Sequence, residues 1–277
     1  MTTSPQQLAD ANGESLTVEQ ALENLRQTAD TGLRYYAAWW LGRFRVAEPE
    51  AIEALVLALQ DEGDRAPDGG YPLRRNAARA LGKLGDRTVV PALIRCLDCD
   101  DYYVREAAAQ ALESLGDSQA IPALRGLLAG GIAAAVAVAD KPHLVQPYNA
   151  VLEALGTLGA VDAIEEITPF LEHEVAQVQN AATRALYQLT GDGTYCDRLV
   201  ERLQAPNLQL RRSAMMDLGA IGYLPAAGAI AATLAENSLK LIALQGVLES
   251  HLGQAGFPQA GLTDDARQVL VLMDELL

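Results

Sequence analysis

The chain has 277 residues, half of them apolar and 21% charged, which is enough apolar material for a packed core and argues against wholesale disorder. Its formal net charge of −15 argues against binding to a phosphate backbone, which requires a basic surface. The longest apolar stretch, around residues 131–139, is too short for a membrane helix of roughly 20 residues, and residues 1–14 lack the basic and apolar regions of a signal peptide. We therefore expect a soluble, cytoplasmic protein that binds no nucleic acid and does not insert into a membrane.

The elements predicted along the chain are helices. Residues 1–16 are polar, and we expect a flexible N-terminal segment there, followed by a single domain over residues 17–277 that begins with a helical pair at about residues 17–46. Residues 73–86 and 104–117 align without a gap at a spacing of 31, so the chain contains an internal repeat. The alignment continues through one marker leucine in each repeat, at Leu41, Leu81, Leu112, Leu155, Leu186 and Leu218.

Each repeat reads as an Ala-rich helix that ends at a glycine, a short turn, and a second amphipathic helix. The second helices at residues 89–97 and 120–128 carry apolar residues at helical spacing, and Pro91 and Pro122 lie in their first turns, where a missing N–H costs little. The pattern resembles the HEAT type of helical repeat. We therefore predict an all-α fold, a right-handed α-α superhelix (solenoid) of roughly seven helical hairpins, with a degenerate helix at about residues 239–252 and a C-terminal helix.

Two of the intervals between repeats carry insertions, near residues 61–72 and 130–147. Both insertions join a second helix to the first helix of the next repeat, so we expect them to emerge on the same edge of the solenoid and to overhang one rim of its concave groove. Because loops on one face of a repeat array often form the binding face, contacts with a ligand or partner are expected at this rim.

The aligned repeats also show which residues depart from the pattern at their position. One column is mostly arginine, and we interpret it as a structural ladder to acids in the turns such as Asp101, with anion binding by one or two members as the alternative. This column reads Arg34, Arg74, Arg105, Tyr148, Gln179 and Arg211. A second column is water-facing in most repeats and holds Trp39, which we expect to be exposed in the groove.

Trp40 and Asp217 stand in a column of alanines. We interpret Trp40 as a cap on the end of the core, because a terminal repeat has no preceding neighbour. Asp217 fits two alternatives, a surface acid after a small shift of register or a semi-buried carboxylate that needs a cationic partner.

Tyrosines gather at the starts of the predicted first helices, on the rim that bears the insertions. Together with Trp39, the first two of them form an aromatic cluster, and exposed aromatic patches usually mark binding. The row either lines a flat conjugated ligand or fills gaps between turns. Its members are Tyr35, Tyr36, Tyr102, Tyr103 and Tyr148.

Conventional catalytic and metal-binding motifs are absent from the sequence. The histidines His143, His173 and His251 have no metal-ligand spacing, and Cys96 and Cys99 form a C-x-x-C without a second pair. We therefore expect no metal, interpret the two cysteines as ordinary helix residues in a reducing cytosol, and expect the histidines to face solvent or lie in loops. His143 lies in the second insertion and is the histidine to test.

Five segments give the chain a specific family resemblance. Residues 34–46 read RYYAAWWLGRFRV, and this string resembles the N-terminal signature of the cyanobacterial phycobilin lyases of the E/F type, in particular their E-type (alpha) subunits. The further similar segments are residues 141–147, 208–213, 217–223 and 235–243. A generic HEAT protein would share the V-R-x-A-A pattern but not the Tyr-Tyr and Trp-Trp pairs.

The resemblance implies an enzyme that is active as a heterodimer with a homologous F-type subunit. Such a lyase binds phycocyanobilin as a substrate, with no permanently bound cofactor, and delivers it to a cysteine of the phycocyanin alpha subunit, where a thioether forms. The acceptor thiol belongs to the client protein, which accounts for a helical repeat without a nucleophile of its own. Catalysis then rests mainly on positioning.

The resemblance and the chemistry of a bilin together nominate site residues. Arg43 and either Arg211 or Arg212 are candidates for the two propionates, and Asp217 for the pyrrole N–H groups. Asp217 and His143 are the candidate catalytic residues. The candidate walls of the site are Tyr35, Tyr36, Trp39, Tyr102, Tyr103 and Tyr148.

Alternatives remain open at this point. A non-catalytic HEAT-repeat adaptor in phycobilisome assembly or turnover fits the repeat equally well, and a lyase for another bilin, or one that isomerises the bilin, fits the segments. The acidic surface either keeps a long solenoid soluble or complements the charge of a partner.

Overall fold

The computed structural model describes residues 16–254 and 262–277, which are helical apart from turns, loops and one isolated antiparallel bridge between Ala137 and Leu144. Residues 1–15 of the segment expected to be flexible lie outside the described residues. The chain divides into two compact units, Met1–Leu158 and Gly159–Leu277. The expectation of a single domain over residues 17–277 stays a prediction.

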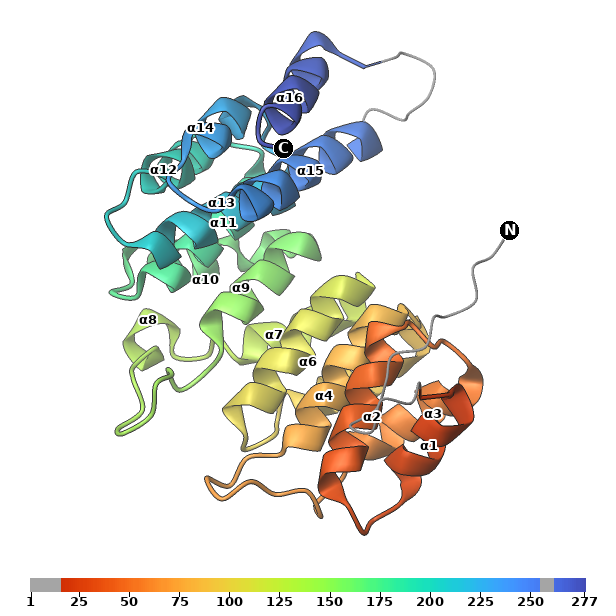
Figure 1. Cartoon of the computed structure of the whole chain (residues 1–277). Coiled ribbons are helices and arrows are strands. Elements are labelled where there is room, and N and C mark those ends of the chain that lie inside the picture. The colour runs from red at the N-terminus through yellow and green to blue at the C-terminus, as the bar shows by residue number, and fades with distance from the viewer. Residues whose placement is uncertain (1–15, 255–261) are drawn as a thin grey trace. The chain divides into compact units, whose positions relative to one another are not determined.

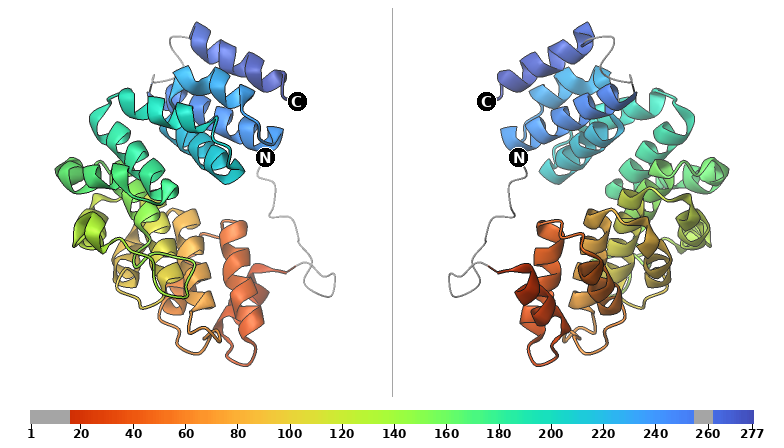
Figure 2. Two further views of the ribbon diagram at one scale, coloured as in Figure 1. Left: turned by 90° about the vertical axis from the view of Figure 1, so that its left-hand side faces the viewer. Right: turned by 90° about the vertical axis from the view of Figure 1, so that its right-hand side faces the viewer.

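The first unit contains nine α-helices in its described residues (Figure 1). Their bounds are α1 Val18–Arg26, α2 Thr31–Arg43, α3 Pro49–Ala58, α4 Pro72–Leu84, α5 Val90–Cys96, α6 Tyr102–Leu115, α7 Ile121–Gly126, α8 Gly131–Ala134 and α9 Tyr148–Thr157, with short 3-10 turns at Arg87–Val89 and Ser118–Ala120. Helices α2, α4, α6 and α9 pack side by side in that order and form the first row (Figure 2). Helix α3 packs against α4, and α5 packs against α6, as part of the second row.

The second unit repeats this arrangement. Its helices are α10 Ile164–Ile167, α11 Ala176–Thr190, α12 Thr194–Arg202, α13 Leu208–Ile221, α14 Ala227–Ala232, α15 Asn237–Gln254 and α16 Asp264–Asp274, with 3-10 turns at Val161–Ala163, Thr168–Glu172 and Leu224–Ala226. Helix α13 packs between α11 and α15. The predicted all-α repeat of helical hairpins is therefore confirmed, including the degenerate helix near residues 239–252, which is α15.

Local signals in the sequence explain where the helices start and stop. Asp101 and Asn207 accept hydrogen bonds from backbone N–H groups at the starts of α6 and α13, which would otherwise lack partners. Gly85 and Gly116 follow α4 and α6 in the left-handed backbone conformation that glycine adopts without strain. The same two signals recur because the sequence itself repeats.

The core of each unit lies between its two rows of helices. In the first unit the marker leucines Leu41, Leu81, Leu112 and Leu155 are buried together with leucines of the second row such as Leu55 and Leu93. The alanine column is buried as well, and it allows the first-row helices to approach closely: a Cβ added to Gly82 would lie 2.7 Å from the Ala111 Cα. Small residues at this position therefore set the spacing of the stack.

Candidate functional site

A cavity of about 640 Å³ opens in the first unit, where both insertions meet the start of α6. The first insertion contributes Arg65 and residues 68–70, the start of α6 contributes residues 100–103 and Arg105, and the second insertion contributes residues 140–143. Both loops lie at the same edge of this unit (Figure 2). The expectation that the two insertions emerge together is confirmed.

The first insertion is held against α4 and α6 by the ring of Tyr71. The guanidinium groups of Arg65 and Arg74 lie 4.5 Å and 3.9 Å from the ring centre, and Arg65 also donates a hydrogen bond to the Tyr71 hydroxyl. The backbone N–H of Tyr71 donates to Asp101 Oδ2 at 2.7 Å, which connects the loop to the start of α6.

The second insertion is held by Arg105 of α6. Its guanidinium donates to the carbonyl of Val145 at 2.8 Å and to Oε1 of Gln146 at 2.9 Å. Within the loop, the N–H of Val138 donates to the carbonyl of His143 at 3.1 Å, and His143 Nδ1 lies 2.8 Å from the carbonyl of Leu144. Only a protonated Nδ1 can make that contact, so in neutral His143 the other ring nitrogen, Nε2, is the one without a proton.

Three predicted site residues form an aromatic cluster where the second insertion meets α6. The rings of Tyr102 and His143 stack with centres 4.1 Å apart and planes 12° apart. Tyr103 meets both rings edge-on, at 5.3 Å from Tyr102 and 5.7 Å from His143. The cluster is a conjugated surface at the wall of the cavity, formed by α6 and the second insertion.

A group of charged side chains adjoins this aromatic cluster. Burial raises the pKa of Glu106, which lies one turn after Tyr102 on α6, while Arg79, Arg75 and His143 act in the opposite direction. Arg75 also lies 5.6 Å from the centre of the Tyr103 ring. Burial, with smaller contributions from Glu106 and Tyr103, raises the pKa of Tyr102 to about 12, so this phenol stays neutral at physiological pH.

The sequence interpretation did not nominate Arg75, Arg79 or Glu106. The repeat alignment held a signal for them: Arg79 stands in the water-facing column of Trp39, and Arg75 and Glu106 both stand in the column of Tyr35. Both columns carry an aromatic residue in the repeat of α2 and an arginine of the same groove face in the next repeat.

The aromatic cluster on α2 is the second group of predicted residues that the structure brings together. Tyr36 and Trp39 stack with ring centres 5.4 Å apart and planes 29° apart. Trp39 is 39% exposed, which confirms the expectation from its column, and Arg43 lies one turn further on and is exposed as well. Tyr35 is also exposed, while its backbone carbonyl accepts a hydrogen bond from Asn76 of α4 at 3.2 Å.

Comparison with known proteins identifies the family. The sequence model of the PBS lyase HEAT-like repeat matches residues 33–61, and that of HEAT repeats matches residues 64–139. The chain is 63% identical to phycocyanobilin lyase subunit alpha of Synechocystis sp. over 94% of this chain and 96% of that protein, and 62% identical to the same subunit of Picosynechococcus sp. over 95% and 97%.

The chain belongs to the phycocyanobilin lyase subunit alpha family. A solved structure supports this assignment: a chain in the complex of CpcE and CpcF of phycocyanin lyase from Nostoc sp. PCC7120 is 59% identical, with a TM-score of 0.89 over 99% of this chain and 100% of that one. The predicted HEAT-repeat fold and the predicted family resemblance are thus both confirmed.

In this member of the family, the arginine column forms the structural ladder that its periodicity predicts. Each arginine donates to backbone carbonyls at the end of a preceding second-row helix: Arg34 to Leu25 at 3.2 Å, Arg74 to Asp61 at 2.6 Å, and Arg105 to Cys99 at 2.6 Å. The expected partner Asp101 is wrong, because this carboxylate instead accepts from the N–H groups of Tyr71 and Tyr103. Another acid of a turn, Asp61, does pair with this column, because it lies 2.7 Å from Arg34 Nη1.

Two residues of this column were candidates for the bilin site, and their contacts speak against that role. Tyr148 is 1% exposed and fills the space that an arginine occupies in other repeats, so its ring presents no accessible wall. Arg211 donates to the carbonyls of Ala205 at 2.6 Å and Leu234 at 3.0 Å, so its guanidinium binds backbone carbonyls as the other arginines of the column do. We therefore leave both residues out of the proposed site.

The remaining candidates lie in the second unit, whereas both aromatic clusters lie in the first. Arg212 pairs through two nitrogens with the carboxylate of Glu236, which raises the pKa of Arg212 and lowers that of Glu236. Asp217 is 6% exposed, accepts from Ser213 Oγ at 3.4 Å and lies 3.9 Å from Arg184 Nη1. It is therefore the semi-buried carboxylate with a cationic partner, and the alternative of a surface acid is wrong.

The residues that the structure describes contain neither a metal-binding group nor a membrane-spanning helix. Among residues 16–254 and 262–277, no three His, Cys, Asp or Glu side chains form a group that could hold a metal ion. Within the same residues, every helix is too short or too polar to cross a membrane. His173 lies in a loop, as expected, although its side chain is buried.

Proposed function

We propose that this chain is the alpha subunit of a phycocyanobilin lyase, which pairs with a homologous F-type subunit and attaches phycocyanobilin through a thioether to a cysteine of the phycocyanin alpha subunit. The observation that carries the proposal is the near full-length match to a chain of the solved two-subunit phycocyanin lyase. Phycocyanobilin is then a substrate that leaves with the client protein, not a resident cofactor, and the cyanobacterial cytoplasm is the expected location.

The first unit offers surfaces that suit a bilin. A bilin is a conjugated tetrapyrrole with two propionates and a row of pyrrole nitrogens. The stacked pair Tyr102 and His143 and the exposed ring of Trp39 are flat apolar surfaces for the conjugated plane. Trp39 lies on α2 and Tyr102 on α6, in the row of helices α2, α4 and α6 that pack side by side, and His143 joins Tyr102 from the second insertion.

Charged residues of the same row suit the polar parts of the substrate. Arg75 and Arg79 on α4, with the exposed Arg43 on α2, supply guanidinium groups for the two propionates. Glu106 offers a carboxylate for the pyrrole N–H groups, the role for which the sequence suggested Asp217. The structure thus supports a site in the first unit that keeps Arg43 from the sequence nomination and takes Arg75, Arg79 and Glu106 in place of the charged candidates of the second unit.

Because the client supplies the thiol, the lyase has to orient the bilin and to assist the transfer of one proton. In thioether formation the client sulfur bonds to one carbon of the exocyclic double bond, the π bond breaks, and the proton released by the thiol passes to the conjugated system. Glu106, whose pKa is raised, and His143, through its Nε2, are the titratable groups at the aromatic cluster that can exchange this proton. The bulk of the rate gain is assigned to positioning.

Co-expression tests the proposal. The full chain is expressed with an F-type subunit, the phycocyanin alpha subunit and a source of phycocyanobilin, and the client is examined by absorbance and by zinc-stained gels under denaturing conditions. We expect a chromophore that resists denaturation only when both lyase subunits are present. A client with its acceptor cysteine replaced by serine is the control for chemical specificity.

Other outcomes separate the alternatives. A stable complex with the client but no covalent chromophore would support a non-catalytic adaptor and contradict the proposed lyase. Covalent attachment with phycoerythrobilin and none with phycocyanobilin would show a lyase for another bilin. An isomerised chromophore would be recognised by its displaced absorbance maximum.

A further inference from the structure

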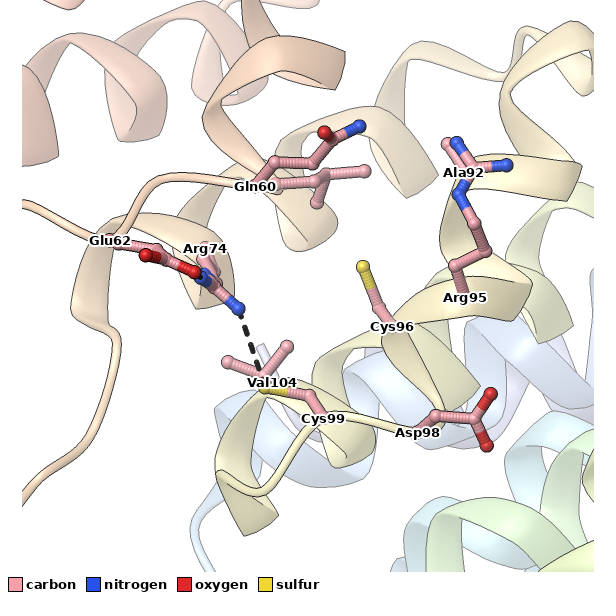
Figure 3. Close-up of a pocket in the computed structure, with 10 residues that line it drawn as sticks. Gln60, Glu62, Arg74, Ala92, Arg95, Cys96, Asp98, Cys99 and Val104 are labelled. Carbon is pink, nitrogen blue, oxygen red and sulfur yellow. Dashed lines mark hydrogen bonds and ion pairs between the residues drawn. The ribbon is translucent and has the colours of Figure 1, made fainter.

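A second cavity lies in the first unit and has no part in the proposed bilin chemistry. It has a volume of about 460 Å³ and opens between the end of α3, the start of α4 and the end of α5. Both cysteines of the C-x-x-C, Cys96 and Cys99, line it, and Figure 3 shows Cys96 pointing into the open space while Cys99 lies beside Arg74. Arg95 and Glu62 are among the charged groups at its wall.

The backbone sets the two cysteines at a Cα separation that suits a disulfide. Cys96 is the last residue of α5, and the N–H of Cys99 donates to the Cys96 carbonyl at 3.2 Å, which closes a single turn. In such a turn the Cα atoms of the first and fourth residues lie within about 7 Å. A disulfide needs a Cα separation of about 4.4 to 6.8 Å, so this turn suits one without a large backbone movement.

The two thiols lie in different environments. Cys99 is partly exposed, and its sulfur lies 3.9 Å from Arg74 Nη1 and 3.7 Å from the Asp100 carboxylate. Cys96 is only 7% exposed, and burial, with the neighbouring Cys99, raises its pKa to about 11. Cys99 is therefore the thiol suited to attack, and Cys96 the thiol that stays protonated until a bond to its neighbour can form.

We propose that Cys96 and Cys99 form a reversible dithiol site that reacts with low-molecular-weight disulfides carrying carboxylates, with Cys99 as the attacking thiol and Cys96 as the resolving thiol. The Cys99 thiolate bonds to one sulfur of the small disulfide and releases a thiolate. Cys96 then bonds to the Cys99 sulfur, the mixed disulfide breaks, and the proton of Cys96 leaves with the second small thiol. The protein pair is oxidised, and one small disulfide is reduced to two thiols.

Charge at the cavity suits a small disulfide that carries both carboxylates and ammonium groups, because Arg74 and Arg95 line it together with Glu62 and Asp98. Arg74 and Arg95 line the same space as the two sulfurs and can pair with carboxylates of a peptide disulfide such as glutathione disulfide. The volume of about 460 Å³ leaves room for such a reagent beside Cys99. Cys196 offers a contrast within the same chain, because it is completely buried and burial raises its pKa to about 12.

The site is connected to the loop that borders the aromatic cavity. Arg74, which contacts Cys99, also donates to the carbonyl of Asp61, lies 3.8 Å from the Glu62 carboxylate and packs on the ring of Tyr71. A disulfide draws the Cys99 sulfur toward Cys96 and so removes one contact of Arg74. Oxidation is therefore expected to loosen the first insertion, residues 61–72.

Mass spectrometry of the full chain, purified with its F-type partner and incubated with glutathione disulfide near pH 7.5, tests the proposal. The wild type is expected to lose two hydrogens through a Cys96–Cys99 disulfide, with little accumulation of the glutathione adduct. Cys96→Ser should stop at one glutathione on Cys99, and Cys99→Ser should give neither product. Peptide mapping should find Cys196 unmodified.

Two further measurements keep the proposal falsifiable. Arg74→Gln should slow the first step by about two- to five-fold, whereas Arg74→Lys, which keeps the charge, should react at nearly the wild-type rate. Tryptic cleavage after Arg65 should be faster in the oxidised protein. Equal modification of Cys196, or a glutathione adduct on the wild type that never resolves to the internal disulfide, would overturn the proposal.

Discussion

Trp39 and Trp40 show how one helix gives two neighbouring tryptophans opposite roles. Consecutive residues of an α-helix point about 100° apart, so only one of the two rings can face the core. Trp40 is 2% exposed and packs 4.9 Å from Phe44, as a cap on the first repeat requires, whereas Trp39 is 39% exposed beside Tyr36. The exposed ring is the one available to a substrate.

Substitution of Trp39 by alanine is expected to weaken bilin binding about three- to ten-fold, because the loss of one stacking surface typically costs about 0.5 to 1.5 kcal/mol. Titration of the heterodimer with phycocyanobilin, followed by absorbance, measures the effect. Leu57→Ala, which removes an exposed apolar side chain from α3, is the matched control. An unchanged absorbance shift and transfer yield would remove Trp39 from the site.

Glu106 makes stability depend on pH in a defined direction. Burial raises its pKa above the ordinary value of 4.5, so just above that pH the folded state holds more protons than the unfolded state. The contribution of Glu106 to stability is therefore complete below the ordinary value and is lost as the pH rises through the raised pKa.

Glu106→Gln should remove this part of the pH dependence, because the amide stays neutral at every pH. Urea unfolding at intervals from about pH 4 to pH 8 should show that the variant loses less stability than the wild type above the ordinary glutamate pKa. The exposed Glu53→Gln on α3 controls for the loss of a carboxylate. Parallel curves for Glu106→Gln and the wild type would contradict the assigned burial.

At the scale of elements, the spacing of α4 and α6 depends on small residues. Gly82 of α4 faces Ala111 of α6, and the nearest atoms to an added Cβ are the Cα and Cβ of that alanine, at 2.7 Å and 2.9 Å. Gly42 faces Ala80 in the same way one repeat earlier. A methyl group at either glycine can be accommodated only if two helices move apart.

Gly82→Ala is expected to lower the free energy of unfolding by about 1 to 3 kcal/mol, the usual cost of an overpacked core. Gly126→Ala, at the end of α7 with no atom within 4 Å of the added Cβ, should leave stability unchanged or raise it by up to about 1 kcal/mol. Urea denaturation of the two variants makes the comparison. Equal stability of Gly82→Ala and the wild type would show that the stack tolerates a wider spacing.

At the scale of the molecule, the division into two compact units predicts how the free energy of unfolding is distributed along the chain. In a repeat protein each repeat contacts mainly its neighbours, so stability is approximately a sum of local contributions. The second unit has its own core cluster, which includes Leu199, Leu218, Ile230 and Val247. A substitution that destabilises this core should therefore increase local unfolding mainly within the second unit.

Leu218→Ala tests this expectation, because the side chain is completely buried and its truncation typically costs about 2 to 5 kcal/mol. Hydrogen exchange followed by mass spectrometry should show faster exchange in residues 159–277 than in the wild type, with a smaller change in residues 16–158. An equal increase in both units would show that the chain unfolds as one cooperative body.

The sequence by itself determined the repeat, the helices and the family, because those signals are local. A glycine after a helix, an aspartate before one, and apolar residues at helical spacing act within a single hairpin and recur in the next. The exposure of Trp39 and the arginine ladder could be predicted for the same reason, since both follow from a column of aligned repeats.

Only the tertiary structure decided which predicted residues meet. Tyr102 and Tyr148 both begin a first-row helix, yet Tyr148 stands in the arginine column and is buried, whereas Tyr102 stacks on His143 of the second insertion. The raised pKa of Glu106 and its interaction with Arg75 and Arg79 depend on the packing of α6 against α4. Burial and electrostatic interaction are set by neighbours distant in the chain, so Arg75, Arg79 and Glu106 emerged as candidates only from the fold, whereas Arg43 was predicted from the sequence.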